Sequence, residues 1–208
     1  NRLTETFTRF QNDPADPNSL SANQVVSIFE DRGEVLWVGT NGGGLSCLYD
    51  SKFITYTMAD GLSENNVRAV AEMSDRSLWV GTDGGGLSRY EPASDSFTHF
   101  RHNPDDPNSL SGDRVRVIYQ DRQGVFWVGT DGDGLNRFNP EDGSFVHYRH
   151  DPQSPDSLAN DKVLVVQGTL AFDDFSGSMR LNADRILEID QAREVYAKRL
   201  VVDVAEQG

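Results

Sequence analysis

The sequence has one cysteine, Cys47, and no run of 18 apolar residues among its 208. A single thiol excludes an internal disulfide and a multi-cysteine metal site. The missing apolar run excludes a transmembrane helix within these residues. Basic residues are also scarce, because 19 lysines and arginines stand against 33 acidic residues, a net charge of −14. An acidic chain repels phosphate backbones, so we expect residues 1–160 to be a poor nucleic-acid binder.

What the sequence does contain is one unit repeated three times. The stretches LWVGTNGGGL (36–45), LWVGTDGGGL (78–87) and FWVGTDGDGL (126–135) are near-copies. An apolar strand precedes each copy, and a short aromatic strand follows it at 53–56, 97–100 or 145–148. Four short strands in each unit, separated by Gly, Asn, Asp and Pro, are typical of the blades of a β-propeller.

We therefore expect a mainly β fold in which residues 1–160 form three four-stranded propeller blades in an open, incomplete ring. The expected blades span about 20–57, 62–101 and 110–149, and the aromatic segment 7–10 is expected to be an additional outer strand. Three blades cover too small an angle to close a ring. Each end blade should then expose an apolar face, through which chains could associate with one another.

Two long segments carry a family resemblance. DPNSLSANQVVSIFEDRGEVLWVGTNGGGL (16–45) and DPNSLSGDRVRVIYQDRQGVFWVGTDGDGLNRFNP (106–140) resemble the two-component regulator propeller repeat. The second unit departs from this pattern, because it begins with MADGLSENNV (58–67) and lacks the Asp-Pro-Asn segment. The resemblance implies the periplasmic sensor region of a bacterial hybrid histidine kinase or diguanylate cyclase. It further implies a small-molecule or glycan ligand, no catalysis and no cofactor.

The last 48 residues carry a different resemblance. VLVVQG, FDDFSG and DQAREVYAKRL (190–200) resemble the OB-fold region of the bacterial DNA polymerase III alpha subunit. We expect residues 161–208 to form a partial OB-fold-like segment, with strands at 163–168, 170–173 and 179–186 and a helix at 190–199. The sequence should change source near Asn160, as a natural chimera, an engineered fusion or an assembly artefact. This segment would imply a cytoplasmic protein, although its few aromatic residues and slight negative charge make nucleic-acid contact a weak expectation.

The expected binding site of the propeller is the mouth of its axis, where the inner strands begin. Polar residues that differ between the copies gather there in the sequence. The candidate ligand-binding residues are Asn23, Gln24, Asn65, Asn66, Arg68, Asp113, Arg114 and Arg116. The alternative is that these side chains only solvate their loops.

Other motifs favour structure over chemistry. TDGGGL lacks the lysine and the helix of a phosphate-binding loop, so we expect a hairpin turn. DGDG (131–134) lacks the remaining ligands of a calcium loop, and a spacing of three places the histidines of HFRH and HYRH on opposite faces of a strand, which disfavours zinc. We expect these histidines to be solvated and the Cys47 thiol to be exposed or half-buried, without a catalytic partner.

Three functional hypotheses follow. The first is a non-catalytic ligand-sensing module of a two-component sensor. The second is a fragment of a DNA polymerase III alpha subunit that contacts single-stranded DNA, and it depends on the tail alone. The third is a protein-interaction scaffold that pairs through its exposed blade faces.

Overall fold

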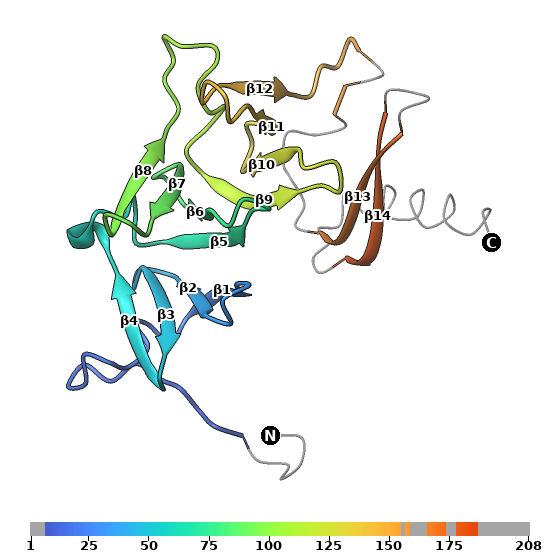
Figure 1. Ribbon diagram of the computed structural model, residues 1–208. Helices are drawn as coiled ribbons and strands as arrows, with labels where there is room; N and C mark the ends of the chain where they lie inside the picture. Colours follow the sequence, from blue (N-terminus) through green and yellow to red (C-terminus); the bar gives the residue numbers. More distant parts are fainter. Residues whose placement is uncertain (1–6, 155–156, 159–165, 174–177, 187–208) are drawn as a thin grey trace.

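The computed structural model describes residues 7–154, 157–158, 166–173 and 178–186. Within them the fold is mainly β, with three four-stranded antiparallel sheets and one two-stranded hairpin, which confirms the expected fold class (Figure 1). The described sheets do not close into a ring. The one described helix is a 3₁₀ turn at Met58–Asp60, and no described helix is long and apolar enough to cross a membrane.

Each four-stranded sheet is a blade built from strands in chain order. Blade 1 contains β1 (Val25–Glu30), β2 (Leu36–Thr40), β3 (Leu45–Tyr49) and β4 (Lys52–Tyr56). Blade 2 contains β5 (Val67–Glu72), β6 (Leu78–Thr82), β7 (Leu87–Glu91) and β8 (Ser96–Phe100). Blade 3 contains β9 (Val115–Gln120), β10 (Phe126–Thr130), β11 (Leu135–Phe138) and β12 (Phe145–Tyr148). The blades fan out from β1, β5 and β9, which lie side by side (Figure 1).

The blades pack face to face through two apolar clusters. The seam between blades 1 and 2, called seam 1–2 below, buries Trp37, Leu45 and Val80. The seam between blades 2 and 3, called seam 2–3, buries Trp79, Leu87 and Val128. Each seam therefore contains the tryptophan of one blade and, from the next blade, the valine that follows its own tryptophan. Apolar burial of this kind is the main force that holds neighbouring blades together.

In each blade a repeated glycine allows the outer strand to approach the hairpin that joins the second and third strands. Gly44 has a φ of +87°, a value that favours glycine. A Cβ at this position would lie 2.2 Å from the carbonyl oxygen of Tyr56, the last residue of β4. Gly86 and Gly134 have the same geometry against Phe100 and Tyr148. The repeated glycine thus combines an unusual backbone angle with a close approach between strands.

The N-terminal segment corrects one expectation. Residues 7–10 were expected to be an outer strand, but they are not in a strand. An outer strand needs the third strand of its own blade as a partner, and in each described blade the third strand already pairs with β4, β8 or β12. Phe10 instead packs edge-on against Phe53, with ring centroids 5.5 Å apart. Leu20 joins Val38 and Phe53 in a small cluster on the open face of blade 1.

The tail contains a hairpin of β13 (Val166–Asp173) and β14 (Ser178–Ile186). β13 covers part of 163–168 and all of 170–173, so two expected strands are one continuous strand. The expected helix at 190–199 and the position of the expected join lie outside the described residues. The OB-like assignment of this segment stays a prediction.

Candidate functional site

Two of the predicted ligand residues are positioned by a repeated irregularity of the inner strand. The pairing of β5 with β6 shifts between Val67 and Ala69, and β9 has the matching shift at its own start. Such a bulge re-aims the side chain of the extra residue. Here the extra residues are Arg68 and Arg116, whose guanidinium groups bond to Asp83 and Asp131 in the hairpins of their own blades.

Arg114 joins these two pairs into one chain of charges at the axis mouth. Its Nε lies 3.2 Å from Oδ1 of Asp83 in blade 2, and its Nη2 lies 2.7 Å from Oδ2 of Asp131 in blade 3. The three arginines and two aspartates form the cluster that we call the axis-mouth charge chain. With three positive and two negative groups it is locally cationic within an acidic protein. The Arg114 side chain is 56% exposed, so a ligand can reach it.

Burial alone would raise the pKa of Asp83. The hydrogen bonds and positive charges of Arg68 and Arg114 outweigh this effect, so the pKa of Asp83 lies below its ordinary value. Asp83 therefore stays ionised at neutral pH and fixes both arginines. In blade 1 the corresponding residues are Val26 and Asn41, so the charge chain belongs to blades 2 and 3.

The other predicted site residues hold loops. Asn23, Asn65 and Asp113 occupy the same position in the three repeats, and the side-chain oxygen of each accepts a backbone N–H from the segment that precedes its inner strand. These distances are 2.8, 2.8 and 2.7 Å. Gln24 Oε1 accepts from Asn41 Nδ2 at 2.8 Å, and the Asn66 carbonyl accepts from the Asp83 N–H at 2.9 Å. These five residues connect loops and neighbouring blades; whether they also bind a ligand stays a prediction.

A buried polar network that sequence reasoning missed recurs in every blade. Thr82 Oγ1 donates to the Gly86 carbonyl at 3.0 Å, and Ser88 Oγ donates to Ser63 Oγ at 2.9 Å. Thr40, Thr82 and Thr130 are fully buried. Buried hydroxyls are tolerated only when they are hydrogen-bonded, which explains the repeated Gly-Thr and Gly-Leu-Ser steps. The signal for this network was present in the repeat itself.

The tryptophans have a second repeated partner. The indole N–H of Trp37 donates to Asp31 Oδ2 at 2.7 Å, and that of Trp127 donates to Asp121 Oδ2 at 2.9 Å. The other oxygen of Asp121 accepts the backbone N–H groups of Gln123 and Val125. One carboxylate therefore shapes the first hairpin and anchors the ring.

One expectation about a reactive side chain needs correction. Cys47 was expected to be exposed or half-buried, but it is 6% exposed, because it faces the packed rings of seam 1–2, and burial raises the pKa of its thiol. The histidines were expected to be solvated, and His99, His102 and His150 are exposed. The rings of His99, His102 and His147 also bond to Ser88, Leu110 and Ser109. The Ser88–His99 distance of 3.0 Å suits a nucleophile pair, yet Ser88 is fully buried. Among the described residues no cluster of His, Cys, Asp or Glu could hold a metal ion.

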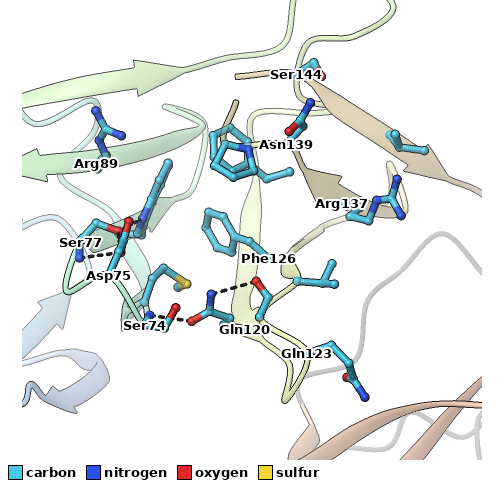
Figure 2. Close-up of a pocket in the computed structure, with 17 residues that line it drawn as sticks. Ser74, Asp75, Ser77, Arg89, Gln120, Gln123, Phe126, Arg137, Asn139 and Ser144 are labelled. Carbon is cyan, nitrogen blue, oxygen red and sulfur yellow. Dashed lines mark hydrogen bonds between the residues drawn. The ribbon is translucent and has the colours of Figure 1, made fainter. Parts of the chain in front are cut away.

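A pocket of 570 Å³ opens at seam 2–3 (Figure 2). It lies at the opposite end of the inner strand from the charge chain, because Gln120, which lines the pocket, ends β9, whereas Arg116 stands near its start. Blade 2 contributes Ser74, Asp75, Trp79 and Arg89, whereas blade 3 contributes Phe126 and Phe138 together with polar residues of its first hairpin. Burial acts to raise the pKa of Asp75. The hydrogen bonds from Ser77 and the charge of Arg89 act in the opposite direction and outweigh burial, so the pKa of Asp75 lies below its usual value. Sequence reasoning did not find this pocket, because no single repeat contains it.

Comparison with known proteins supports the propeller part. Residues 19–42 and 109–132 match the family model of the two component regulator propeller. The extracellular domain of a hybrid two-component system from B. thetaiotaomicron is 31% identical, with a TM-score of 0.61 over 75% of this chain. PorZ, a surface component of the type-IX secretion system of Porphyromonas gingivalis, shares the fold at 20% identity and a TM-score of 0.52 over 77% of this chain. This chain spans 21% and 23% of those two proteins.

A separate relative matches a short segment. The DNA polymerase III subunit alpha of Escherichia coli K12 is 41% identical over 44 residues, which are 21% of this chain and 4% of that protein. The two resemblances therefore concern different classes of protein. The propeller resemblance has support from sequence and structure, whereas the polymerase resemblance is a short sequence match only.

Proposed function

We propose that residues 1–160 are part of the ligand-sensing region of a bacterial two-component sensor. The observation that carries the proposal is the 31% identity to the extracellular domain of such a system, over three quarters of this chain and with a matching fold. The proposal includes a periplasmic location for this part. It also includes a non-catalytic role.

The axis-mouth charge chain is the proposed ligand contact. Arg114 is exposed and crosses from one blade to the next, so a ligand that bonds to it would change the contact between blades 2 and 3. A shift in the contacts between propeller units is a physical means by which binding can be passed to an output domain. A small polar molecule or glycan with an acceptor group fits this cationic position.

The gene itself tests the sensor assignment. A genomic read that extends beyond both ends should encode further propeller repeats, a membrane-spanning segment and a kinase or cyclase domain in the same reading frame. A frame that instead continues into polymerase sequence on both sides would overturn the assignment.

A titration of the chain with neutral and acidic disaccharides tests the ligand contact. The amide NMR signals of Arg68, Arg114 and Arg116 should shift, and these shifts should disappear in the Arg114→Ala variant.

The tail supports a second, separate proposal. The short polymerase match favours a role in replication for residues after about 160, with contact to single-stranded DNA. A gel-shift with single-stranded DNA at low salt tests this role, and the absence of any shift would overturn it.

Self-association through the open face of blade 1 stays a prediction, supported by Ile28, which is 65% exposed. Light scattering should then give a mass above that of one 23.1 kDa chain.

A further inference from the structure

We propose that the pocket at seam 2–3 binds an α-amino acid with an apolar side chain. Arg89 would hold its carboxylate and Asp75 its ammonium group. This site is distinct from the axis mouth. Arg116 stands at the start of β9 and Gln120, which lines the pocket, stands at its end. Four residue steps of strand lead from one to the other, about 13 Å at 3.3 Å for each step.

The pocket results from a difference between the two seams. Five residues before its tryptophan, blade 1 has Arg32, whose Nη1 donates to the carbonyls of Met73 and Ser74 at 3.1 and 3.2 Å. This arginine closes the corresponding end of seam 1–2. At the same repeat position blade 2 has Ser74, which is too short to cross. Its backbone N–H is met from blade 3 by Gln120 Oε1 at 2.7 Å.

The aromatic filling of the two seams differs in the same way. In seam 1–2 Trp37 stacks on Tyr56 at 6.3 Å, and the hydroxyls of Tyr56 and Tyr90 lie 3.1 Å apart. In seam 2–3 the corresponding rings are Phe100 and Phe138, which have no hydroxyl groups to bond to each other. The inner wall of the pocket is therefore apolar, with the rings of Phe126 and Phe138 against Trp79 (Figure 2).

Arg89 supplies the cation of the pocket. Its guanidinium carbon lies 5.8 Å from the centre of the Trp79 ring, and its Nε donates to Glu91 Oε1 at 2.6 Å. No described residue bonds to either of its Nη atoms. The N–H groups on the two Nη atoms can therefore donate side by side to a carboxylate. The Trp79 ring and Glu91 hold the guanidinium group in place.

Asp75 supplies the matching anion. Its Oδ1 accepts the backbone N–H and the hydroxyl of Ser77, at 3.0 and 2.6 Å. Within the described part of the chain nothing bonds to its Oδ2. Because Arg89 is already paired with Glu91, an additional plain carboxylate would be repelled by the charges of Asp75 and Glu91. A ligand that carries both an ammonium and a carboxylate satisfies both groups, which selects a zwitterion over a simple anion or cation.

The size and the remaining lining select the ligand body. A volume of 570 Å³ accommodates a single amino acid with room for water. Phe126, Phe138 and Val125 offer an apolar surface to its side chain. The Gln123 amide forms no hydrogen bond with a described residue and lies at the pocket rim, where Figure 2 shows it.

The test uses the whole 208-residue chain and amide NMR titration with L-phenylalanine. Shifts should centre on Ser74, Asp75 and Arg89. 3-Phenylpropionate, which lacks the ammonium group, and phenethylamine, which lacks the carboxylate, should each bind at least about tenfold more weakly, since each loses one charged contact. Equal binding of either analogue, shifts centred on Arg114, or no shifts at all would overturn the proposal.

Matched variants locate the contacts. Arg89→Gln and Asp75→Asn should each weaken L-phenylalanine binding at least about tenfold. Arg122→Gln is the control, because Arg122 lies exposed in the first hairpin of blade 3 and is not among the residues that line the pocket. Ser74→Arg installs the residue of blade 1 and should block binding while the melting temperature is kept. Unchanged binding in Arg89→Gln, or an equal loss in Arg122→Gln, would contradict the assignment.

Discussion

Replacing Gly81 by alanine tests whether blades 2 and 3 pack as tightly as the structure indicates. A Cβ at Gly81 would lie 2.5 Å from Cγ1 of Val115 and 3.1 Å from its Cβ, in the next blade. Val115 is fully buried at the start of β9 and cannot rotate away without displacing its neighbours. Gly81 has no positive φ, so the clash between blades, and not backbone strain, should decide the result.

The magnitude follows from that overlap. Overpacking of a buried contact costs about 1–3 kcal/mol, which exceeds the gain of about 0.4–1 kcal/mol from a less flexible unfolded chain. Val115→Ala should cost about 2–3 kcal/mol, because it removes two buried methyl groups and leaves a cavity. In the double variant the new methyl group occupies the space of the lost ones. Its total cost should therefore fall below the sum of the single costs by about 1–2 kcal/mol.

Urea unfolding followed by tryptophan fluorescence measures these free energies, since all three tryptophans lie in the blades. The same cycle with Gly39→Ala and Val67→Ala examines seam 1–2, where a Cβ would lie 2.6 Å from Val67 Cγ1. If Gly81→Ala is neutral or stabilising, or if the two changes add within about 0.5 kcal/mol, the blades do not meet as described.

Three further changes address the polar groups of the blades. Asp121→Ala should lower the free energy of unfolding by about 2–3 kcal/mol, because the Trp127 indole and two backbone N–H groups lose their acceptor. Urea unfolding measures this change, and a loss below about 0.5 kcal/mol would contradict the role of Asp121 as their acceptor. Thr130→Val should cost about 1–3 kcal/mol in the same assay, since it removes a buried hydroxyl that donates to Gly134 and leaves Ser111 without that partner. Asp83 has a lowered pKa, so its contribution to stability is present above its unfolded value of 3.8 and is lost as the pH falls through the folded value. In a pH series of melting temperatures Asp83→Asn should be less stable than the parent at pH 6, and the gap should close below pH 3.8; a gap independent of pH would refute this.

The repeat made most of the fold predictable. Trp37, Trp79 and Trp127 recur in the same local pattern, so strand order and blade number could be read from one sequence. The status of residues 7–10 could not, because a strand exists only where a neighbouring strand offers free hydrogen-bonding groups.

The candidate sites were only partly predictable. Arg68, Arg114 and Arg116 could be placed at the axis mouth from the repeat, but their shared aspartates Asp83 and Asp131 were assigned only to a turn. The pairing depends on a bulge, which shifts the register by one residue and leaves no trace in the apolar pattern. The pocket was missed for a related reason. It depends on Ser74 being shorter than Arg32, a difference that matters only once the blades are stacked.

The most direct test of the stacked blades is the nuclear Overhauser effect between the second strand of one blade and the inner strand of the next. The Hα atoms of Gly39 and Gly81 should give cross-peaks to the methyl groups of Val67 and Val115, because each glycine lies against the valine of the next blade. Cross-peaks at both seams are the predicted result. Their absence at both, in a chain whose strands within each blade still pair, would contradict the arrangement of the three sheets.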